Sequence, residues 1–397
     1  MSLQKESRVG PIARGRFYRN ALIFTVLMLV GLGLLVIYTS SSIPAEIKFK
    51  DSLFFVRKQA MFGLLGFLAI IAIQYIPFRF FEKITLPFIV ITILLLTVTL
   101  IPGLQHKANG ASRWVKLGFF TFQPAEVGKL AWILFLAKSL SRSSSRIDKD
   151  PKAILPNVIL LGLIASLLMM QPDFGSTVVY ASMGFVMLFV AGLPIRYILT
   201  AGALGLTGAV AAIIHAPYRL KRITSFLNPW DTIQTGGFQI VQSYLGFHNG
   251  GLLGAGFGES RQKLFFLPEA HTDFILSVIG EEAGLIGVFL VVACFAYIAW
   301  LGMKITSLQT DPYKKFLALG LSALISIQAI VNMGVAMGLL PTKGMPLPFV
   351  SFGSSSLLSF LLMIGILAKL ATSPESSSHG KATQDQNPSP APSPQPA

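Results

Sequence analysis

Residues 21–40 read ALIFTVLMLVGLGLLVIYTS, a stretch without a single charged side chain. A helix of about 20 apolar residues crosses the hydrocarbon core of a bilayer, which is about 30 Å thick. The stretch is too long for the hydrophobic region of a cleavable signal peptide, and no convincing cleavage site follows it. We therefore expect it to remain in the protein as a membrane anchor.

Similar apolar runs recur along the whole chain of 397 residues, which is 53% hydrophobic and only 12% charged. Soluble globular proteins carry about twice that charged fraction, and a β-barrel would need short alternating segments instead. The sequence predicts an all-α polytopic membrane protein with about ten transmembrane helices. The expected segments are 20–41, 58–77, 84–102, 123–140, 153–170, 174–192, 196–216, 274–303, 313–340 and 351–371.

An even number of spans places both termini on the same side of the membrane. Basic residues are dense at 5–19 and 138–152, and this bias favours a cytoplasmic location for both ends. We expect three parts: a basic cytoplasmic N-terminus (1–19), a ten-helix membrane domain (20–371) and a disordered Ser/Pro-rich tail (372–397). A large extracytoplasmic loop (217–272) is expected between the seventh and eighth helices, and loops of that length are usually functional.

The net charge of +15 does not indicate nucleic-acid binding, because the basic residues lie at the ends of apolar runs and form no basic arm. The single cysteine, Cys294, excludes a disulfide within one chain. The five histidines show no zinc-binding spacing, so we expect no protein-held metal site. The glycine-rich GAGFG at 254–258 lacks the spacing of a dinucleotide-binding loop.

Residues 269–282 read EAHTDFILSVIGEE and place four carboxylates where an apolar run begins. Thr272 or Asp273 could cap the helix that follows. A cap explains only one of these side chains, and Asp273 at the rim of the membrane is also placed to act as a general base. The deeper Glu281 and Glu282 are expected to bond to neighbouring helices and to have a supporting role, as is Glu269.

The motif QPAEVGKL sets Gln123, Glu126 and Lys129 three residues apart, on one side of a helix. Charged groups at membrane depth are rare and are functional candidates by default. A Glu126–Lys129 pair could take part in catalysis, or it could hold the bundle together as a buried ion pair.

Cations also gather in the segments expected on the outer side, where they could bind phosphate oxygens or anchor the chain to lipid headgroups. The candidates are Lys107, Arg113, Lys116, Arg219, Lys221, Arg222 and Lys343.

Several longer stretches, in this order, resemble the SEDS family (shape, elongation, division and sporulation; FtsW, RodA and SpoVE proteins). They are KANGASRWVKLG, FQPAEVGKL, QPDFGST, RITSFLNPWD, GGLLGAGFGESRQKLFFLPEAHTDFILSVIGEEAG and LPTKGMPLPFVSFGSSSLL. PTKG and HTDFI…IGEE are more similar to the division branch, FtsW, than to the elongation branch, and a sporulation paralogue is the alternative. Phe352 and Ser354 depart from the family's SYGGSS pattern.

The resemblance implies ten membrane helices and a peptidoglycan glycosyltransferase that polymerises lipid II at the outer face of the bacterial cytoplasmic (inner) membrane, at the division septum. The family's catalytic aspartate matches Asp273. The substrate-binding candidates are then Lys107, Arg113, Lys129, Arg219, Lys343, Glu126, His271 and Ser351, with Gln123 in a supporting role. The implied partners are a class B penicillin-binding protein (an FtsI-like transpeptidase), other divisome proteins and membrane lipids, with no nucleic acid.

Two other functions fit parts of the pattern. A lipid II flippase would also need cations and buried acids, but it predicts polar groups on both sides of the membrane. A divisome scaffold leaves the residues around Asp273 unexplained. The sequence requires no cofactor, although a divalent cation, Mg²⁺ or Mn²⁺, could accompany the pyrophosphate of the substrate.

Overall fold

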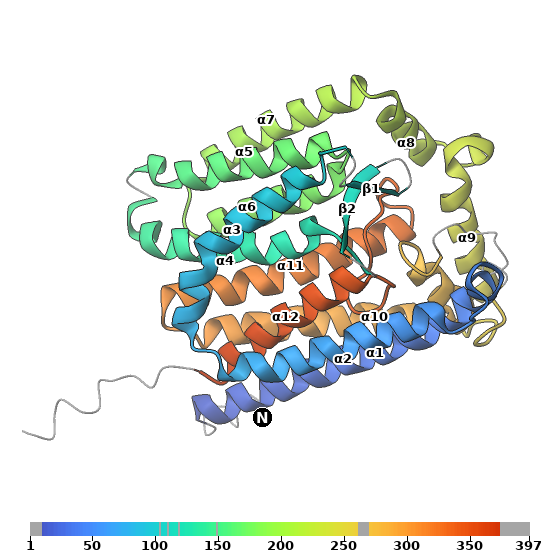
Figure 1. Cartoon of the computed structure of the whole chain (residues 1–397), viewed down its shortest axis with the longest axis horizontal. Helices are drawn as coiled ribbons and strands as arrows, with labels where there is room; N and C mark the ends of the chain where they lie inside the picture. Colours follow the sequence, from blue (N-terminus) through green and yellow to red (C-terminus); the bar gives the residue numbers. More distant parts are fainter. Residues whose placement is uncertain are drawn as a thin grey trace, which may run out of the picture.

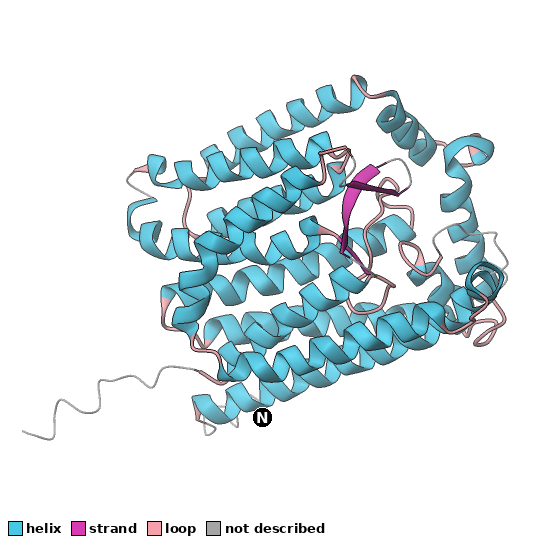
Figure 2. Ribbon diagram, viewed as in Figure 1, coloured by secondary structure: helices cyan, strands magenta, loops and turns pink. Residues whose placement is uncertain are grey.

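The computed structural model describes residues 10–102, 105–108, 111–117, 120–147, 150–260 and 270–373. Helices dominate these residues, and most lie side by side in one bundle (Figures 1 and 2). The helices are α1 (Pro11–Phe49), α2 (Phe54–Tyr75), α3 (Phe78–Val98), α4 (Pro124–Ile147), α5 (Leu155–Met170), α6 (Phe174–Val190), α7 (Ile195–Ile214), α8 (Pro217–Leu227), α9 (Phe238–Gly250), α10 (Ile275–Ser307), α11 (Pro312–Ala336) and α12 (Ser354–Ala371). Short 3₁₀ and π turns at Pro151–Ile154 and Ile233–Gly237 precede α5 and α9.

The predicted helical class is confirmed, and each of the ten expected apolar segments corresponds to one of α1–α7 or α10–α12. Within the described residues, seven helical segments are long and apolar enough to cross a membrane; these contain α1, α2, α3, α5, α10, α11 and α12. The count of ten spans stays a prediction.

A small antiparallel sheet, which the sequence analysis did not anticipate, lies between α3 and α4. Its strands are β1 (Gln105–Ala108), β2 (Ala111–Leu117) and β3 (Phe120–Phe122), in that order. Its adjacent strands pair at, for example, Gln105 with Val115 and Lys116 with Thr121. The strands lie at the end of the bundle where α8 and α9 also gather (Figure 1).

The helices at the centre of the bundle are α11 and α12, whose most apolar windows are 67% and 89% buried. Those nearer the edge leave large apolar side chains exposed, as Leu64, Leu94, Ile159 and Leu199 illustrate. Side chains of this kind are stable against lipid, and the exposed apolar surface is what a bilayer covers.

The two ends of the membrane domain meet. Gly15 near the start of α1 contacts the end of α12 so closely that an added Cβ would lie 1.9 Å from the Ala371 carbonyl oxygen. The segments next to the two termini therefore lie on the same side of the bundle, as an even number of spans requires.

The region predicted as a large loop (217–272) carries α8 and α9 within its described part. Its glycine-rich stretch, residues 250–258, packs against a break in α10 at Gly284, where φ is 64° and ψ is −163°. The N–H groups of Ala255 and Gly256 donate to the carbonyl oxygens of Glu281 and Glu282, at 2.9 and 3.0 Å. The N–H of Leu285 donates in turn to Gly251, at 2.9 Å.

This backbone pairing explains the glycines of the 250–258 stretch, whose spacing is not that of a dinucleotide-binding loop. Backbone groups freed by a break in a membrane helix must find partners inside the protein, and the 250–258 stretch supplies them. An added Cβ at Gly284 would lie 2.4 Å from the Gly254 nitrogen. Only glycine fits both the conformation and the close approach.

We expect Gly284→Ala to destabilise the protein by at least about 1–3 kcal/mol, because this backbone conformation is essentially restricted to glycine. The measurement is the thermal unfolding midpoint of purified protein in detergent. Gly162→Ala is the matched control, since a Cβ there, on helix α5, would meet nothing within 4 Å. Equal midpoints for the two variants would contradict this account of the break.

Candidate active site

Asp273 lies in the turn just before α10, at the end of the bundle that also holds α8, α9 and the small sheet (Figure 1). Phe274 occupies the N-cap position of α10 and makes no side-chain cap. The structure therefore does not give Thr272 or Asp273 the N-cap position that the sequence analysis considered. Asp273 is partly buried, so its carboxylate borders both protein and solvent.

The loop between α11 and α12 approaches this carboxylate through its PTKG motif. A Cβ added to Gly344 would lie 3.2 Å from Asp273 Oδ2. Gly344 therefore lets the backbone pass beside the carboxylate, and Lys343 precedes it directly in the chain.

Two amides on α11 hold this loop in place. Asn332 Nδ2 donates to the carbonyl oxygens of Asp273 and Met345, at 3.0 and 2.6 Å. One turn earlier, Gln328 Nε2 donates to the Pro346 carbonyl oxygen at 3.2 Å. Both amide side chains are buried. Together they fix the turn that carries Asp273 relative to the PTKG loop.

The predicted Glu126–Lys129 pair is present and buried. Lys129 Nζ donates to Glu126 Oε1 at 2.6 Å and to Gln328 Oε1 at 2.7 Å, and Lys129 and Glu126 are 2% and 3% exposed. These contacts join α4 to α11 and give the pair the structural role that was one of its two expected roles. Through Gln328 the ammonium group is also connected to the loop that carries Lys343.

Three predicted cations meet at the N-terminus of α6, in the QPDFGST motif. Lys343 Nζ donates to the Gly175 carbonyl oxygen, and Arg113 donates to that of Pro172. Arg113 Nη1 also lies 3.9 Å from Asp173 Oδ1. We call Arg113, Arg219 and Lys343 the cation cluster.

The third member, Arg219 on α8, lies 5.9 Å from the centre of the Phe174 ring. Asp173 fixes the cluster to the start of α6. Its carboxylate caps this helix, accepting from the Ser176 N–H at 3.1 Å and from the Ser176 hydroxyl at 2.8 Å. The carboxylate that caps α6 therefore lies where the cation cluster meets, beside Arg113.

The pKa of Lys343 is lowered from 10.5 to about 7, mainly by burial; the Asp173 carboxylate opposes this shift, and the Lys129 and Arg113 charges add to it. The lysine is therefore close to half-charged at neutral pH. Since its pKa is lower in the folded protein than in the unfolded chain, its contribution makes the free energy of unfolding rise as the pH increases from about 7 to 10.5.

His271 and Ser351 frame the site. The His271 ring packs against those of Phe55 and Phe352, with centres 4.7 and 5.7 Å away, and its carbonyl oxygen accepts from the Phe352 N–H at 2.9 Å. The Ser351 hydroxyl accepts from the Leu347 N–H at 2.9 Å. In these contacts both residues fix the shape of the loop beside Asp273.

The acids deeper in α10 bond to neighbouring elements, and their supporting role stays a prediction. Glu281 accepts from the Ser260 hydroxyl, and Glu282 accepts from the Thr39 hydroxyl of α1 at 2.9 Å. The Gln123 N–H donates to the Ser355 hydroxyl at 3.2 Å. Glu269 lies outside the described residues. Lys107 is placed only by its backbone in β1, so these two assignments stay predictions.

Four polar residues that organise the site were not among the predicted site residues: Gln59, Asp173, Gln328 and Asn332. Gln59 on α2 donates to the Ser351 carbonyl oxygen at 2.9 Å and accepts from the Gly353 N–H at 3.2 Å. A signal was available for two of them, since Gln328 and Asn332 are four residues apart on one face of an apolar helix.

The described part of the chain contains no group of three or more His, Cys, Asp or Glu side chains that could hold a metal ion. Fold and geometry define a polytopic membrane protein in which the loop that packs against Asp273 also carries Lys343 to the cation cluster at α6.

Comparison with known proteins gives the family. Residues 20–376 match the family model of the FtsW/RodA/SpoVE cell cycle proteins. The chain is 41% identical over 355 residues to a probable peptidoglycan glycosyltransferase FtsW of Geobacter metallireducens, which covers 89% of this chain and 95% of the relative. It is 40% identical over 356 residues to the stage V sporulation protein E of Bacillus subtilis, covering 88% of this chain and 96% of the relative.

Solved structures agree. A chain from a structure of a peptidoglycan synthase complex matches with a TM-score of 0.73 and 27% identity, covering 88% of this chain and 96% of that one. The rod shape determining protein RodA of Thermus thermophilus matches with a TM-score of 0.64 and 26% identity, covering 89% and 97%. The chain belongs to the FtsW/RodA/SpoVE family, and the predicted family is confirmed.

We expect the amine of Lys343 to titrate near pH 7, because burial disfavours its charged form. The measurement is the rate of modification by an amine-specific reagent as a function of pH, followed at Lys343 by mass spectrometry. The exposed Lys221 on α8 is the internal control for reagent decay. A midpoint at pH 9 or above for Lys343 would contradict the effect of burial.

Proposed function

We propose that this chain is a peptidoglycan glycosyltransferase that polymerises lipid II, with Asp273 as the general base. The observation that carries the proposal is the close approach of the PTKG loop to Asp273, because the same loop carries Lys343, a member of the cation cluster at the start of α6. Relatives named as probable peptidoglycan glycosyltransferases, at about 40% identity over most of the chain, support the reaction class.

In this reaction the 4-hydroxyl of one sugar attacks the anomeric carbon of another. The new glycosidic bond forms as the bond from that carbon to the lipid pyrophosphate breaks. Asp273 accepts the hydroxyl proton, because an alcohol is a weak nucleophile until a base takes that proton. A single base, with no second carboxylate placed as a nucleophile among the described residues, implies direct displacement with inversion at the anomeric carbon.

The leaving group, undecaprenyl pyrophosphate, gains negative charge on its phosphate oxygens as the bond breaks. The cation cluster would stabilise that charge, and the two arginines can bind phosphate oxygens through pairs of N–H groups. Binding of the pyrophosphate would also favour the charged form of Lys343. The lipid tail would stay in the bilayer beside the bundle.

A divalent cation, Mg²⁺ or Mn²⁺, would enter with the pyrophosphate, because the described residues offer it no carboxylate cluster. The steps assigned to Asp273 and to the cation cluster use only the chain's own side chains.

The reaction is proposed to take place at the outer face of the cytoplasmic membrane, at the division septum, with both termini in the cytoplasm. The proposed partners are a class B penicillin-binding protein with a single membrane helix and other divisome proteins. A neighbour solved as part of a peptidoglycan synthase complex supports a partner of this kind.

We expect Asp273→Asn to lower the rate of polymerisation about 10²–10⁴-fold, because the amide keeps the shape of the side chain but cannot accept the proton. The measurement is gel analysis of glycan strands made from fluorescent lipid II, with and without the partner. Asp231→Asn, at an exposed position between α8 and α9, is the matched control.

Polymer from the wild type and from Asp231→Asn, but not from folded Asp273→Asn, is the expected result. Equal polymer from all three would place the base elsewhere. No polymer from any of them, with an active partner present, would favour the flippase.

We also expect kcat/KM for lipid II to fall as the pH rises above about 7, because Lys343 of the free enzyme then loses its proton. Lys343→Met removes the charge while keeping a similar shape. Its kcat/KM should be lower than that of the wild type at pH 6.5 and should lack this decline between roughly pH 6.5 and 8.5. A decline of the same size in both proteins would show that another group titrates.

A further inference from the structure

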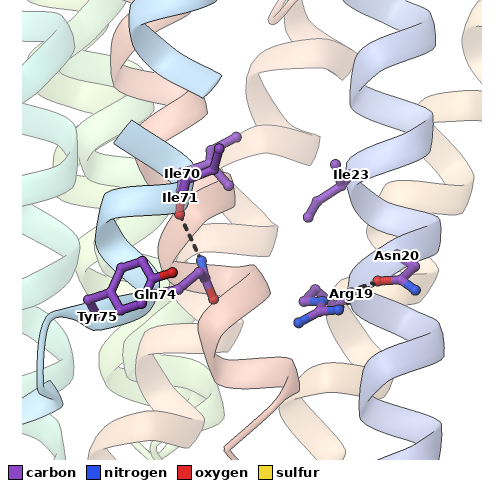
Figure 3. A pocket seen from close by; sticks show the side chains of 7 residues that line it. All are labelled: Arg19, Asn20, Ile23, Ile70, Ile71, Gln74 and Tyr75. Carbon is purple, nitrogen blue, oxygen red and sulfur yellow. Dashed lines mark hydrogen bonds between the residues drawn. The ribbon is translucent and has the colours of Figure 1, made fainter. Parts of the chain in front are cut away.

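A groove between α1 and α2 lies in the N-terminal part of α1 and at the C-terminal end of α2. It has a volume of about 180 Å³. Arg19, Asn20 and Ile23 line it from α1, and Ile70, Ile71, Gln74 and Tyr75 line it from α2 (Figure 3). Both helices place polar residues at one end of the groove and isoleucines at the other.

The two ends of the groove are separated along the helix axes. Arg19 and Ile23 are four positions apart, as are Ile71 and Tyr75, and this spacing corresponds to about 6 Å along each helix. The polar end of the groove lies toward the N-terminus of α1 and at the C-terminus of α2. A lipid has this same division, with a phosphate at the surface and methylene groups directly below it.

Charge makes the groove selective. Arg16 lies one turn before Arg19 on the same side of α1 and is exposed, and Arg19 donates to its neighbour Asn20, at 3.0 and 3.1 Å. The described residues that line the groove include no acidic side chain. Two guanidinium groups at a membrane boundary favour an anionic headgroup over a zwitterionic one.

We propose that this groove binds an anionic phospholipid, with its phosphate on Arg16 and Arg19 and an acyl chain against Ile23, Ile70 and Ile71. A second groove between α1 and α10 is lined by Phe24, Met28 and Cys294 among others and has no cation, so it lacks this headgroup chemistry. The site does not depend on the proposed enzymatic activity.

The bound lipid would hold α1 and α2 together at this end of the bundle. Gln74, at the floor of the groove, already connects α2 to α12, since its amide donates to the Ile70 and Gly365 carbonyl oxygens at 2.9 and 3.1 Å. The dashed line from Gln74 in Figure 3 marks the first of these bonds. The Gln74 side chain is thus held in place without a bound lipid.

The test is native mass spectrometry of the full-length protein titrated with phosphatidylglycerol and, separately, with phosphatidylcholine. The double variant Arg16→Gln/Arg19→Gln should bind phosphatidylglycerol about 20-fold more weakly than the wild type. The matched control is Arg142→Gln/Arg146→Gln, which removes two exposed arginines at the end of α4. It should keep the affinity of the wild type.

Ile71→Trp, which fills the apolar end while leaving both arginines in place, separates a groove from diffuse attraction between charges. Weaker phosphatidylglycerol binding by this variant supports the site, and unchanged binding overturns it. Equal losses in the two arginine pairs, or equal wild-type affinity for the two lipids, would also overturn it. Polymer synthesis by these variants in detergent reports on the enzyme separately.

Discussion

The side-chain amide of Asn332 donates to two carbonyl oxygens that belong to separate loops, those of Asp273 and Met345. Buried carbonyl groups without a partner cost roughly 1–3 kcal/mol each, so neither loop can move away from α11 cheaply. Because α11 is one of the most buried helices of the bundle, its position is set by packing on several sides. The packing of the bundle therefore sets the position of the Asp273 carboxylate relative to the PTKG loop.

Gln328 extends the same constraint to the buried charge of Lys129. It connects the Lys129 ammonium to the Pro346 carbonyl, one residue beyond the one that Asn332 holds. The loop between α11 and α12 is therefore fixed by two amides on its inner side and, through Lys343, by the start of α6. A site built this way needs little rearrangement when a pyrophosphate arrives, and such preorganisation is what stabilises developing charge in a reaction.

Much of the bundle could be predicted from sequence, because apolar runs of membrane length leave few alternatives to a helix. Asp273 and Lys343 could be singled out because charges are rare in such a chain. The break at Gly284 could not, since the apolar pattern continues through it and its partner stretch, 250–258, lies in a different element. Gln59 was missed for a similar reason: it bonds backbone groups far away in the sequence, at Ser351 and Gly353, which no local pattern reveals.

The small sheet is a further case. Its strands are only 3–7 residues long, and it places Arg113 against the α6 N-terminus, a contact between positions 59–60 residues apart in the chain. The sequence indicated that cations would gather near the substrate, but not that the cap of α6 would be their meeting point.

The central claim is that the carboxylate of Asp273 and the cation cluster act on one bound substrate. The most direct measurement is a cryo-electron microscopy structure of Asp273→Asn with lipid II. We predict the pyrophosphate against Arg113 and Lys343, and a sugar hydroxyl about 2.6–3.2 Å from the side chain at position 273. A substrate whose pyrophosphate lies away from the α6 N-terminus, or whose hydroxyls are all far from position 273, would contradict the account.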